Sequence, residues 1–332
     1  MFSPASFFGS AADMPIEARA VRLRTALACI LVGVSGGSGM SRRWFGTDGI
    51  GEAARDRLTP ELALSVGRAF AYALGNGRPA RLVIGRDTRL SGSMLEAAVA
   101  AGIAAAGGDA RLAGVVPTPA VGRLVLAGGF AAGVAISTSR YPFRDNGLIL
   151  FGPDGRRLSE NMESQVEVAM ESRPSSGDDV GSVSDYAGAA PLYVEDLLEA
   201  LRVDLSGLRV LLDCAQGATY QVAPLAFRAA GAQVDAVCIE PDGTNINACC
   251  GVADLGLLSS RAAQGSYHLG LAFDGGGERV LAVDASGHPI EGGQIVAMVE
   301  SWLKERGRPW NGLAAVDGDG IGTGLLLAQA YV

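Results

Sequence analysis

Short apolar runs recur along the chain, and most of them lead through a turn into a helical pattern. Such runs predict strands buried on both faces, because helices cover both sides of a parallel sheet. The regular alternation of strands and helices predicts an α/β protein with doubly wound sheets. We expect strands at 82–86, 130–136, 148–151, 208–213, 234–239, 269–273 and 280–284, and helices at 59–74, 94–106, 192–202 and 294–304.

Composition agrees with this fold class and argues against other functions. Apolar residues make up 48% of the 332 residues, enough for a well-buried core, and the 47 glycines suit tight turns. The net charge is −8 and no basic stripe runs along the chain, which argues against nucleic-acid binding. An anionic ligand must therefore be bound by local arginines and backbone N–H groups.

The cysteines indicate reduced thiols. Two of the five are adjacent, and no C-x-x-C pair occurs, so the spacing predicts no zinc site. An odd number of cysteines in a chain of this size fits a cytoplasmic protein. They are Cys29, Cys214, Cys238, Cys249 and Cys250.

Residues 1–39 differ from the rest of the chain. Arginines precede an apolar stretch at 25–34, and a Ser/Gly-rich segment follows it. The apolar stretch is too short to span a bilayer, which needs about 20 residues, so no membrane partner is expected. We predict that 1–39 is a leader or extension outside the fold and that the folded part starts at Met40. A signal-peptide core is the alternative.

A cluster of hydroxyl side chains follows one of the apolar runs. The segment Ile136–Pro142 reads ISTSRYP, and its proline ends any regular structure. A hydroxyl on a loop at the end of a strand is well placed to act as a nucleophile or to carry a phosphate. The alternative interpretation is an ordinary Ser/Thr-rich turn.

Four motifs in order resemble those of the α-D-phosphohexomutases, over about residues 40–310. They read FGTDGIG from Phe45, VIGRDTRLSG from Val83, ISTSRYPFRDNGLILFG from Ile136 and AFDGGGER from Ala272. The resemblance is strongest to the bacterial phosphoglucosamine mutase branch. It implies that Ser139 is the phosphoserine that passes a phosphoryl group to and from a sugar phosphate.

The resemblance also implies the other site residues. Arg140 stands where the family has a histidine, and Ile149 stands at the family's lysine. Strand-end arginines aimed at a helix start suit phosphate, although an Arg–Asp ion pair that fixes the loop is an alternative. The implied catalytic residues are Ser139, Arg140 and Arg86; the implied phosphate-binding residues are Thr47, Asp48, Arg86, Arg89 and Arg279.

The family's Mg²⁺ loop is degenerate in this chain. Ser139, Asp274 and Glu278 are the implied metal ligands, but Gly276 replaces one of the family's aspartates. We therefore expect Mg²⁺ as the cofactor, bound weakly, because this ion demands six oxygen ligands. Without the resemblance, the stretch is most simply a glycine-rich hairpin turn. Asp317 and Asp319, in a later Gly-rich turn, are interpreted as surface turn residues.

The resemblance implies tandem three-layer α/β/α domains with mixed, mostly parallel sheets. Residues 40–186 would form domain I with the phosphoserine loop, 187–292 domain II with the metal loop, and 293–332 the start of domain III; a fourth domain is missing from the sequence. Leu325, Leu326 and Leu327 would then need cover, which predicts self-association or a partner protein.

The resulting hypothesis is a phosphoglucosamine mutase-like enzyme with impaired catalysis. The family reaction interconverts glucosamine 6-phosphate and glucosamine 1-phosphate through phosphoserine and Mg²⁺. The losses at Gly276 and Ile149 argue against normal turnover. The alternatives are a non-catalytic relative that binds a sugar phosphate or a partner protein, and the product of a decaying gene copy.

Overall fold

The computed structural model describes residues 44–46, 49–51, 58–75, 80–172, 180–307 and 318–331, all within one compact unit. The predicted leader at 1–39 and the predicted site residues Thr47 and Asp48 lie outside the described residues, as does Asp317. Across the described residues, no helix is both long enough and apolar enough to cross a membrane.

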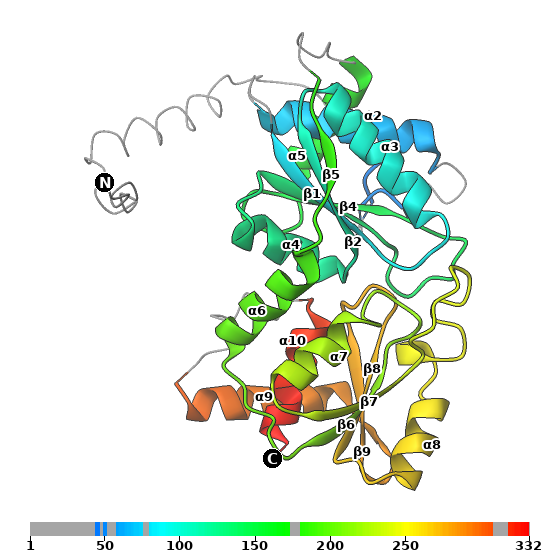
Figure 1. Cartoon of the computed structure of the whole chain (residues 1–332), viewed down its shortest axis with the longest axis vertical. Coiled ribbons are helices and arrows are strands. Elements are labelled where there is room, and N and C mark those ends of the chain that lie inside the picture. The colour runs from blue at the N-terminus through cyan, green and yellow to red at the C-terminus, as the bar shows by residue number, and fades with distance from the viewer. Residues whose placement is uncertain are drawn as a thin grey trace, which may run out of the picture. The chain divides into compact units, whose positions relative to one another are not determined.

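The first half of the described chain forms a mixed sheet with helices packed around it (Figure 1). Its five strands have the order β4-β3-β1-β2-β5. Parallel pairs join β1 to β2 and β3, and β2 to β5, whereas β4 runs antiparallel to β3. The strands are β1 (Arg81–Arg86), β2 (Asp109–Val115), β3 (Ala132–Ile136), β4 (Leu148–Phe151) and β5 (Val183–Asp185).

Helices cover both faces of this sheet. Alternate β1 side chains point to opposite faces, so Leu82 and Ile84 join one core cluster and Val83 joins another. The helices α2 (Pro60–Gly75), α3 (Gly92–Ala105) and α5 (Glu160–Ser172) pack on the first face, and α4 (Thr118–Ala127) packs on the second.

The second half forms another mixed five-stranded sheet with the order β10-β9-β8-β6-β7. Strand β6 is parallel to β7 and to the central strand β8, and β9 is antiparallel to β8. The elements are β6 (Arg209–Asp213), β7 (Gln233–Val237), β8 (Leu269–Phe273), β9 (Val280–Asp284), β10 (Pro289–Ile290), α6 (Ala189–Leu201), α7 (Val222–Ala229), α8 (Gly256–Gln264), α9 (Gly292–Glu305) and α10 (Gly320–Ala330).

These two sheets confirm the predicted α/β class. Helix α8 packs against one face of the second sheet, and α6, α7, α9 and α10 contribute to the core on the other face. The predicted strand pair 269–273 and 280–284 matches β8 and β9. The domain boundaries at 186 and 292 stay predictions.

Local sequence signals account for the closest helix contact. Thr59 caps α2, since its Oγ1 accepts a hydrogen bond from the backbone N–H of Leu62 at 3.3 Å. Glycines allow the backbones of α2 and α3 to meet: a Cβ on Gly67 would lie 2.3 Å from the carbonyl oxygen of Val99, and one on Gly102 would lie 2.1 Å from that of Leu64. No side chain fits at either position.

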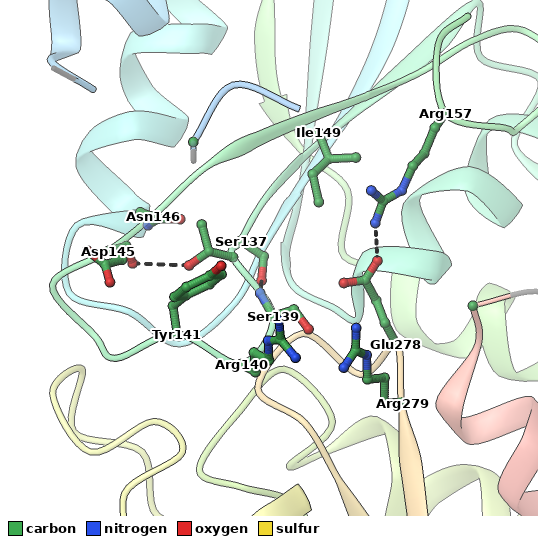
Figure 2. Close-up of a pocket in the computed structure, with 13 residues that line it drawn as sticks. Ser137, Ser139, Arg140, Tyr141, Asp145, Asn146, Ile149, Arg157, Glu278 and Arg279 are labelled. Atoms are coloured by element: carbon green, nitrogen blue, oxygen red, sulfur yellow. Dashed lines mark hydrogen bonds and ion pairs between the residues drawn. The ribbon is translucent and has the colours of Figure 1, made fainter. Parts of the chain in front are cut away.

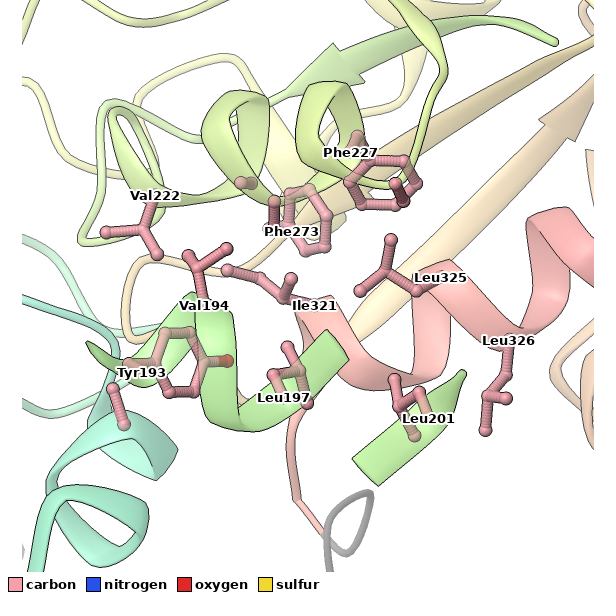
Figure 3. Close-up of a cluster of buried hydrophobic side chains, with 14 of the residues drawn as sticks. Tyr193, Val194, Leu197, Leu201, Val222, Phe227, Phe273, Ile321, Leu325 and Leu326 are labelled. Atoms are coloured by element: carbon pink, nitrogen blue, oxygen red, sulfur yellow. The ribbon is translucent and has the colours of Figure 1, made fainter. Parts of the chain in front are cut away.

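Three predictions about the chain are wrong, and the first two concern a linker and the burial of α10. The polar, turn-rich composition of 172–186 predicts a linker or loop, but β5 extends the first sheet there as a three-residue edge strand. Leu325, Leu326 and Leu327 were expected to need cover. All three are fully buried within this chain, and Figure 3 shows Leu325 and Leu326 of α10 among side chains of α6, α7 and β8. Their burial removes the reason to expect self-association.

Asp319 is also not a surface turn residue. It is 2% exposed and caps α10, accepting hydrogen bonds at 2.9 Å from the backbone N–H of Gly322 and from the Tyr193 hydroxyl on α6. Burial raises the pKa of Asp319 to about 6, against the effect of these two hydrogen bonds. The contact attaches the start of α10 to α6.

Truncation of a buried leucine on α10 tests this packing. The substitution Leu326→Ala should lower the free energy of unfolding by about 2–5 kcal/mol, because it leaves a cavity in the core. Leu126→Ala, at a side chain of α4 that is 61% exposed, is the matched control and should cost less than about 0.5 kcal/mol. Urea unfolding measures both values. Equal small losses would show that α10 does not complete the core.

The raised pKa of Asp319 predicts a specific pH dependence. Between an ordinary value of 3.8 and about 6, the folded protein holds a proton that the unfolded chain has lost. This group's contribution to stability therefore falls as pH rises through that window, by on the order of 3 kcal/mol. Asp319→Asn keeps the cap and removes the titration.

Urea unfolding of both proteins between pH 4 and 7 measures the effect. The stability of the natural protein relative to Asp319→Asn should decline with rising pH. Asp242→Asn is the control, because hydrogen bonds from Thr244 lower the pKa of this exposed carboxyl. The stability of the natural protein relative to Asp242→Asn should rise with pH, since the stabilisation by the ionised Asp242 carboxylate is lost as pH falls. A flat difference for Asp319→Asn would contradict the raised pKa.

Candidate active site

Two loops meet at the carboxyl ends of parallel strands, where α/β proteins bind ligands. The serine loop, residues 137–147, follows β3, and the glycine-rich loop, residues 274–279, follows β8. Ser139 has a φ of 45°, in the left-handed region that non-glycine residues rarely adopt. Such strain persists only where the surroundings enforce it, and it is concentrated at functional sites. Ser139 is therefore the first candidate for a chemical role.

The Ser139 hydroxyl contacts one carboxylate directly. Its Oγ donates a hydrogen bond to Oδ2 of Asp274, and its backbone N–H donates to Ser137 Oγ at 3.2 Å. Asp274 is fully buried, and its Oδ1 accepts from the backbone N–H groups of Glu278 at 2.8 Å and Arg279 at 3.2 Å. The glycine-rich loop thus folds around Asp274, as the turn interpretation predicted.

Asn247 joins the two loops, a role that was not predicted from the sequence. Its Nδ2 donates to the carbonyl oxygens of Ser139 at 3.0 Å and Tyr141 at 3.2 Å, and its Oδ1 accepts from Gly275 N–H at 2.9 Å. The backbone N–H of Thr118 also donates to the carbonyl of Gly276 at 2.9 Å. The position of Asn247 in an Asn-Ile-Asn stretch was the available signal.

Arg89 supports the serine loop from the other side. It is 1% exposed, forms a buried ion pair with Asp87, and donates to the carbonyl of Tyr141 at 2.5 Å. This is the loop-fixing role given as the alternative above. Arg86 donates to Glu96 at 3.1 Å. Neither arginine lines the cavity described below, so a phosphate-binding role for them stays a prediction.

A cavity of about 340 Å³ opens above Ser139. Figure 2 shows Arg140 and Arg279 close to Ser139, with Arg157 in an ion pair with Glu278. Neither Arg140 nor Arg279 forms an ion pair with another described residue. Guanidinium groups suit phosphate, because their planar N–H donors match its oxygens. The other lining residues are Gly51, Ser137, Thr138, Tyr141, Asp145, Asn146, Ile149 and Gly318.

The predicted metal ligands do not form a three-carboxylate site. Ser139 and Asp274 are in contact, but the carboxylate of Glu278 pairs with Arg157 and Gly276 offers no side-chain oxygen. The residues present therefore do not fit the oxygen-rich coordination that Mg²⁺ requires.

The surroundings of Gly276 could accommodate the carboxylate that the family has at this position. A Cβ there would lie 3.1 Å from Ser137 Oγ and 3.2 Å from Thr118 Oγ1. The buried Thr118 Oγ1 has no hydrogen-bond partner among the described residues. Two hydroxyl donors thus face the place where a carboxylate at position 276 would lie.

Comparisons with known proteins agree with this arrangement. Residues 42–176 match the family model described as phosphoglucomutase/phosphomannomutase, alpha/beta/alpha domain I. The structure of a phosphoglucomutase/phosphomannomutase family protein from Burkholderia thailandensis matches with a TM-score of 0.67 and 26% identity, over 81% of this chain and 60% of that protein. The chain belongs to the α-D-phosphohexomutase superfamily.

Within that superfamily, the chain is similar to phosphoglucosamine mutases. It is 45% identical over 269 residues to the phosphoglucosamine mutase of Pelotomaculum thermopropionicum, covering 79% of this chain and 60% of the relative. It is 45% identical over 271 residues to that of Mycobacterium leprae, covering 80% of this chain and 58% of the relative. The chain thus spans about three fifths of the length of these curated relatives.

Removal of the Arg89 side chain tests the support of the serine loop. Arg89→Met leaves the carboxylate of Asp87 buried without its partner, which should lower the free energy of unfolding by about 3–5 kcal/mol. The double substitution Asp87→Leu/Arg89→Met should recover much of this loss. Arg209→Met, which breaks an exposed Arg–Asp pair, is the control and should change stability little. Similar losses of unfolding free energy for Arg89→Met and Arg209→Met in urea would show that the buried Arg89–Asp87 pair does not stabilise the fold.

Proposed function

We propose that this chain is a phosphoglucosamine mutase-like phosphohexomutase with strongly impaired turnover that still binds a sugar phosphate beside Ser139. One observation carries the proposal. Ser139 has the position and strained backbone of a phosphoryl carrier, yet the glycine-rich loop supplies it with only one carboxylate, Asp274. The family reaction interconverts glucosamine 6-phosphate and glucosamine 1-phosphate.

The negative charge next to Ser139 supports the proposal that this serine is not phosphorylated. A phosphoserine carries about −1.5 to −2 charges at neutral pH. In this site it would be placed directly against the buried carboxylate of Asp274, which the Ser139 hydroxyl now contacts. The degenerate metal loop lacks the carboxylates to hold a cation between these two anions, so only nearby arginines remain to compensate them. Arg140 and Arg279 line the cavity and are better placed to attract the phosphate of a bound ligand.

The residues of the cavity wall support the proposal that proton transfer is slow in this site. Ile149 lines the cavity and is 3% exposed, so an apolar surface stands where the family has a lysine. General acid–base groups contribute about 10²–10⁴-fold to such reactions. Arg140 adds positive charge next to Ser139 but cannot act as a base, because its guanidinium does not deprotonate.

The second candidate is a non-catalytic relative that binds a sugar phosphate. The excess of cationic side chains in the cavity favours it, because Arg140, Arg157 and Arg279 line the cavity with two acidic residues, Asp145 and Glu278. Arg157 forms an ion pair with Glu278. A role in binding a partner protein has no comparable support. For either candidate we propose a cytoplasmic location, which fits the reduced cysteines.

Three measurements on the full chain test the proposal. Intact mass should show no phosphate, which would add about 80 Da. Calorimetric titration should give a dissociation constant for Mg²⁺ in the millimolar range or weaker. Conversion of glucosamine 6-phosphate should be at least about 10²-fold slower than by a mutase with the complete metal loop.

Two variants complete the experiment. Ser139→Ala removes the proposed carrier and should abolish any residual turnover. Gly276→Asp supplies the missing carboxylate beside Thr118 Oγ1 and should strengthen Mg²⁺ binding. Micromolar Mg²⁺ binding, or a normal rate, in the unaltered protein would overturn the proposed impairment. Binding of glucosamine 6-phosphate without any turnover would favour the non-catalytic candidate.

A further inference from the structure

Two thiols and a carboxylate from distant parts of the chain meet at one end of the second sheet. Asp213 ends β6, Cys238 follows β7, and Cys250 precedes a short 3-10 helix at Gly251–Ala253. One donor atom from each of the three lies within 4.8 Å of the other two. Asp213 and Cys250 are buried and Cys238 is half-buried. The sequence predicted no zinc site, because two of its cysteines are adjacent and no C-x-x-C pair occurs.

We propose that Asp213, Cys238 and Cys250 bind a thiophilic divalent cation, and that Zn²⁺ is the ion they suit best. Thiolate and carboxylate are both ordinary zinc ligands. Bond lengths of about 2.3 Å to sulfur and 2.0–2.2 Å to oxygen place the donor atoms of a tetrahedral site about 3.3–3.8 Å apart. Side-chain movements of about 1 Å close the cluster onto an ion of this size.

The backbone around the cluster holds the ligands in place. Asp213 Oδ1 accepts from Ala215 N–H and Oδ2 accepts from Gly251 N–H, each at 2.9 Å. Each carboxylate oxygen has a second lone pair that remains available to a metal. The Cys238 carbonyl accepts from Gln216 N–H at 2.8 Å. Such outer hydrogen bonds orient the ligands of metal sites.

An ion can reach the cluster and have its coordination completed there. Cys238 is only half-buried, which provides the route from solvent, and water can supply the fourth ligand. The adjacent Cys249 is exposed and is not part of the cluster. Cys249 is therefore a matched control for the proposed ligand Cys250.

The cluster is connected to the candidate active site through one short segment. Cys250 lies three residues after Asn247, whose side chain holds the carbonyls of Ser139 and Tyr141 and the N–H of Gly275. A bound ion would fix this segment at Cys250. It should therefore slow the opening of the serine loop.

Metal titration of the reduced, chelator-treated full chain tests the site. Co²⁺ should give a thiolate-to-metal charge-transfer band with one equivalent bound. Zn²⁺ should displace it with a dissociation constant of about 1 µM or tighter, measured by chelator competition. Cys250→Ser should weaken Zn²⁺ binding by at least about 100-fold, whereas Cys249→Ser should leave it unchanged. Cys238→Ala provides a second ligand variant if Cys250→Ser does not fold.

Other results would overturn the proposal. No thiolate band, or equal losses in Cys249→Ser and Cys250→Ser, would show that the cluster binds no metal. A Cys238–Cys250 disulfide in peroxide-treated protein, found as a loss of about 2 Da without metal binding before treatment, would assign the thiols to redox chemistry instead. Hydrogen exchange gives the last test: Zn²⁺ should protect residues 245–251 and the serine loop, and unchanged exchange would contradict the connection through Asn247.

Discussion

The side chain of Asn247 satisfies backbone groups from both halves of the candidate site, and the geometry around Ser139 depends on it. Buried carbonyl and N–H groups must be paired, and this amide pairs with two carbonyls of the serine loop and one N–H of the glycine-rich loop. Arg89 adds donors to the same carbonyls from the first sheet. Neutral and cationic donors of this chain therefore hold the backbone that carries the serine hydroxyl.

Charge is distributed unevenly across the site. The one buried carboxylate of the glycine-rich loop already accepts hydrogen bonds on both oxygens, whereas the arginines lie at the opening of the cavity. Arrangements of this kind attract an anion to the opening but stabilise little additional negative charge at the serine itself. This distribution of charge is the basis of our proposal that the site holds a phosphorylated ligand more readily than it forms a phosphoenzyme.

The sequence predicted elements whose burial follows from composition and missed features that depend on distant contacts. The apolar run 269–273 can only be a buried strand, and it is β8. Strand β5 was missed because its three residues, Val183–Asp185, are polar or exposed and pair only at an edge. Ser139 and Asp274 could be identified from their motifs. The Asn-Ile-Asn stretch marks the position of Asn247, but its role could not be predicted, because that role arises from contacts across more than 100 residues of sequence.

The junction between α6 and α10 has a consequence for biosynthesis. Tyr193 and its partner Asp319 are 126 residues apart, so α6 leaves the ribosome long before the helix that covers it. During that interval the apolar side chains of α6 that later face α10 remain exposed on the nascent chain. Surfaces of this kind aggregate, and chaperones bind them. The yield of this protein in a cell should therefore depend on translation speed and on chaperone supply as much as on the stability of the finished fold.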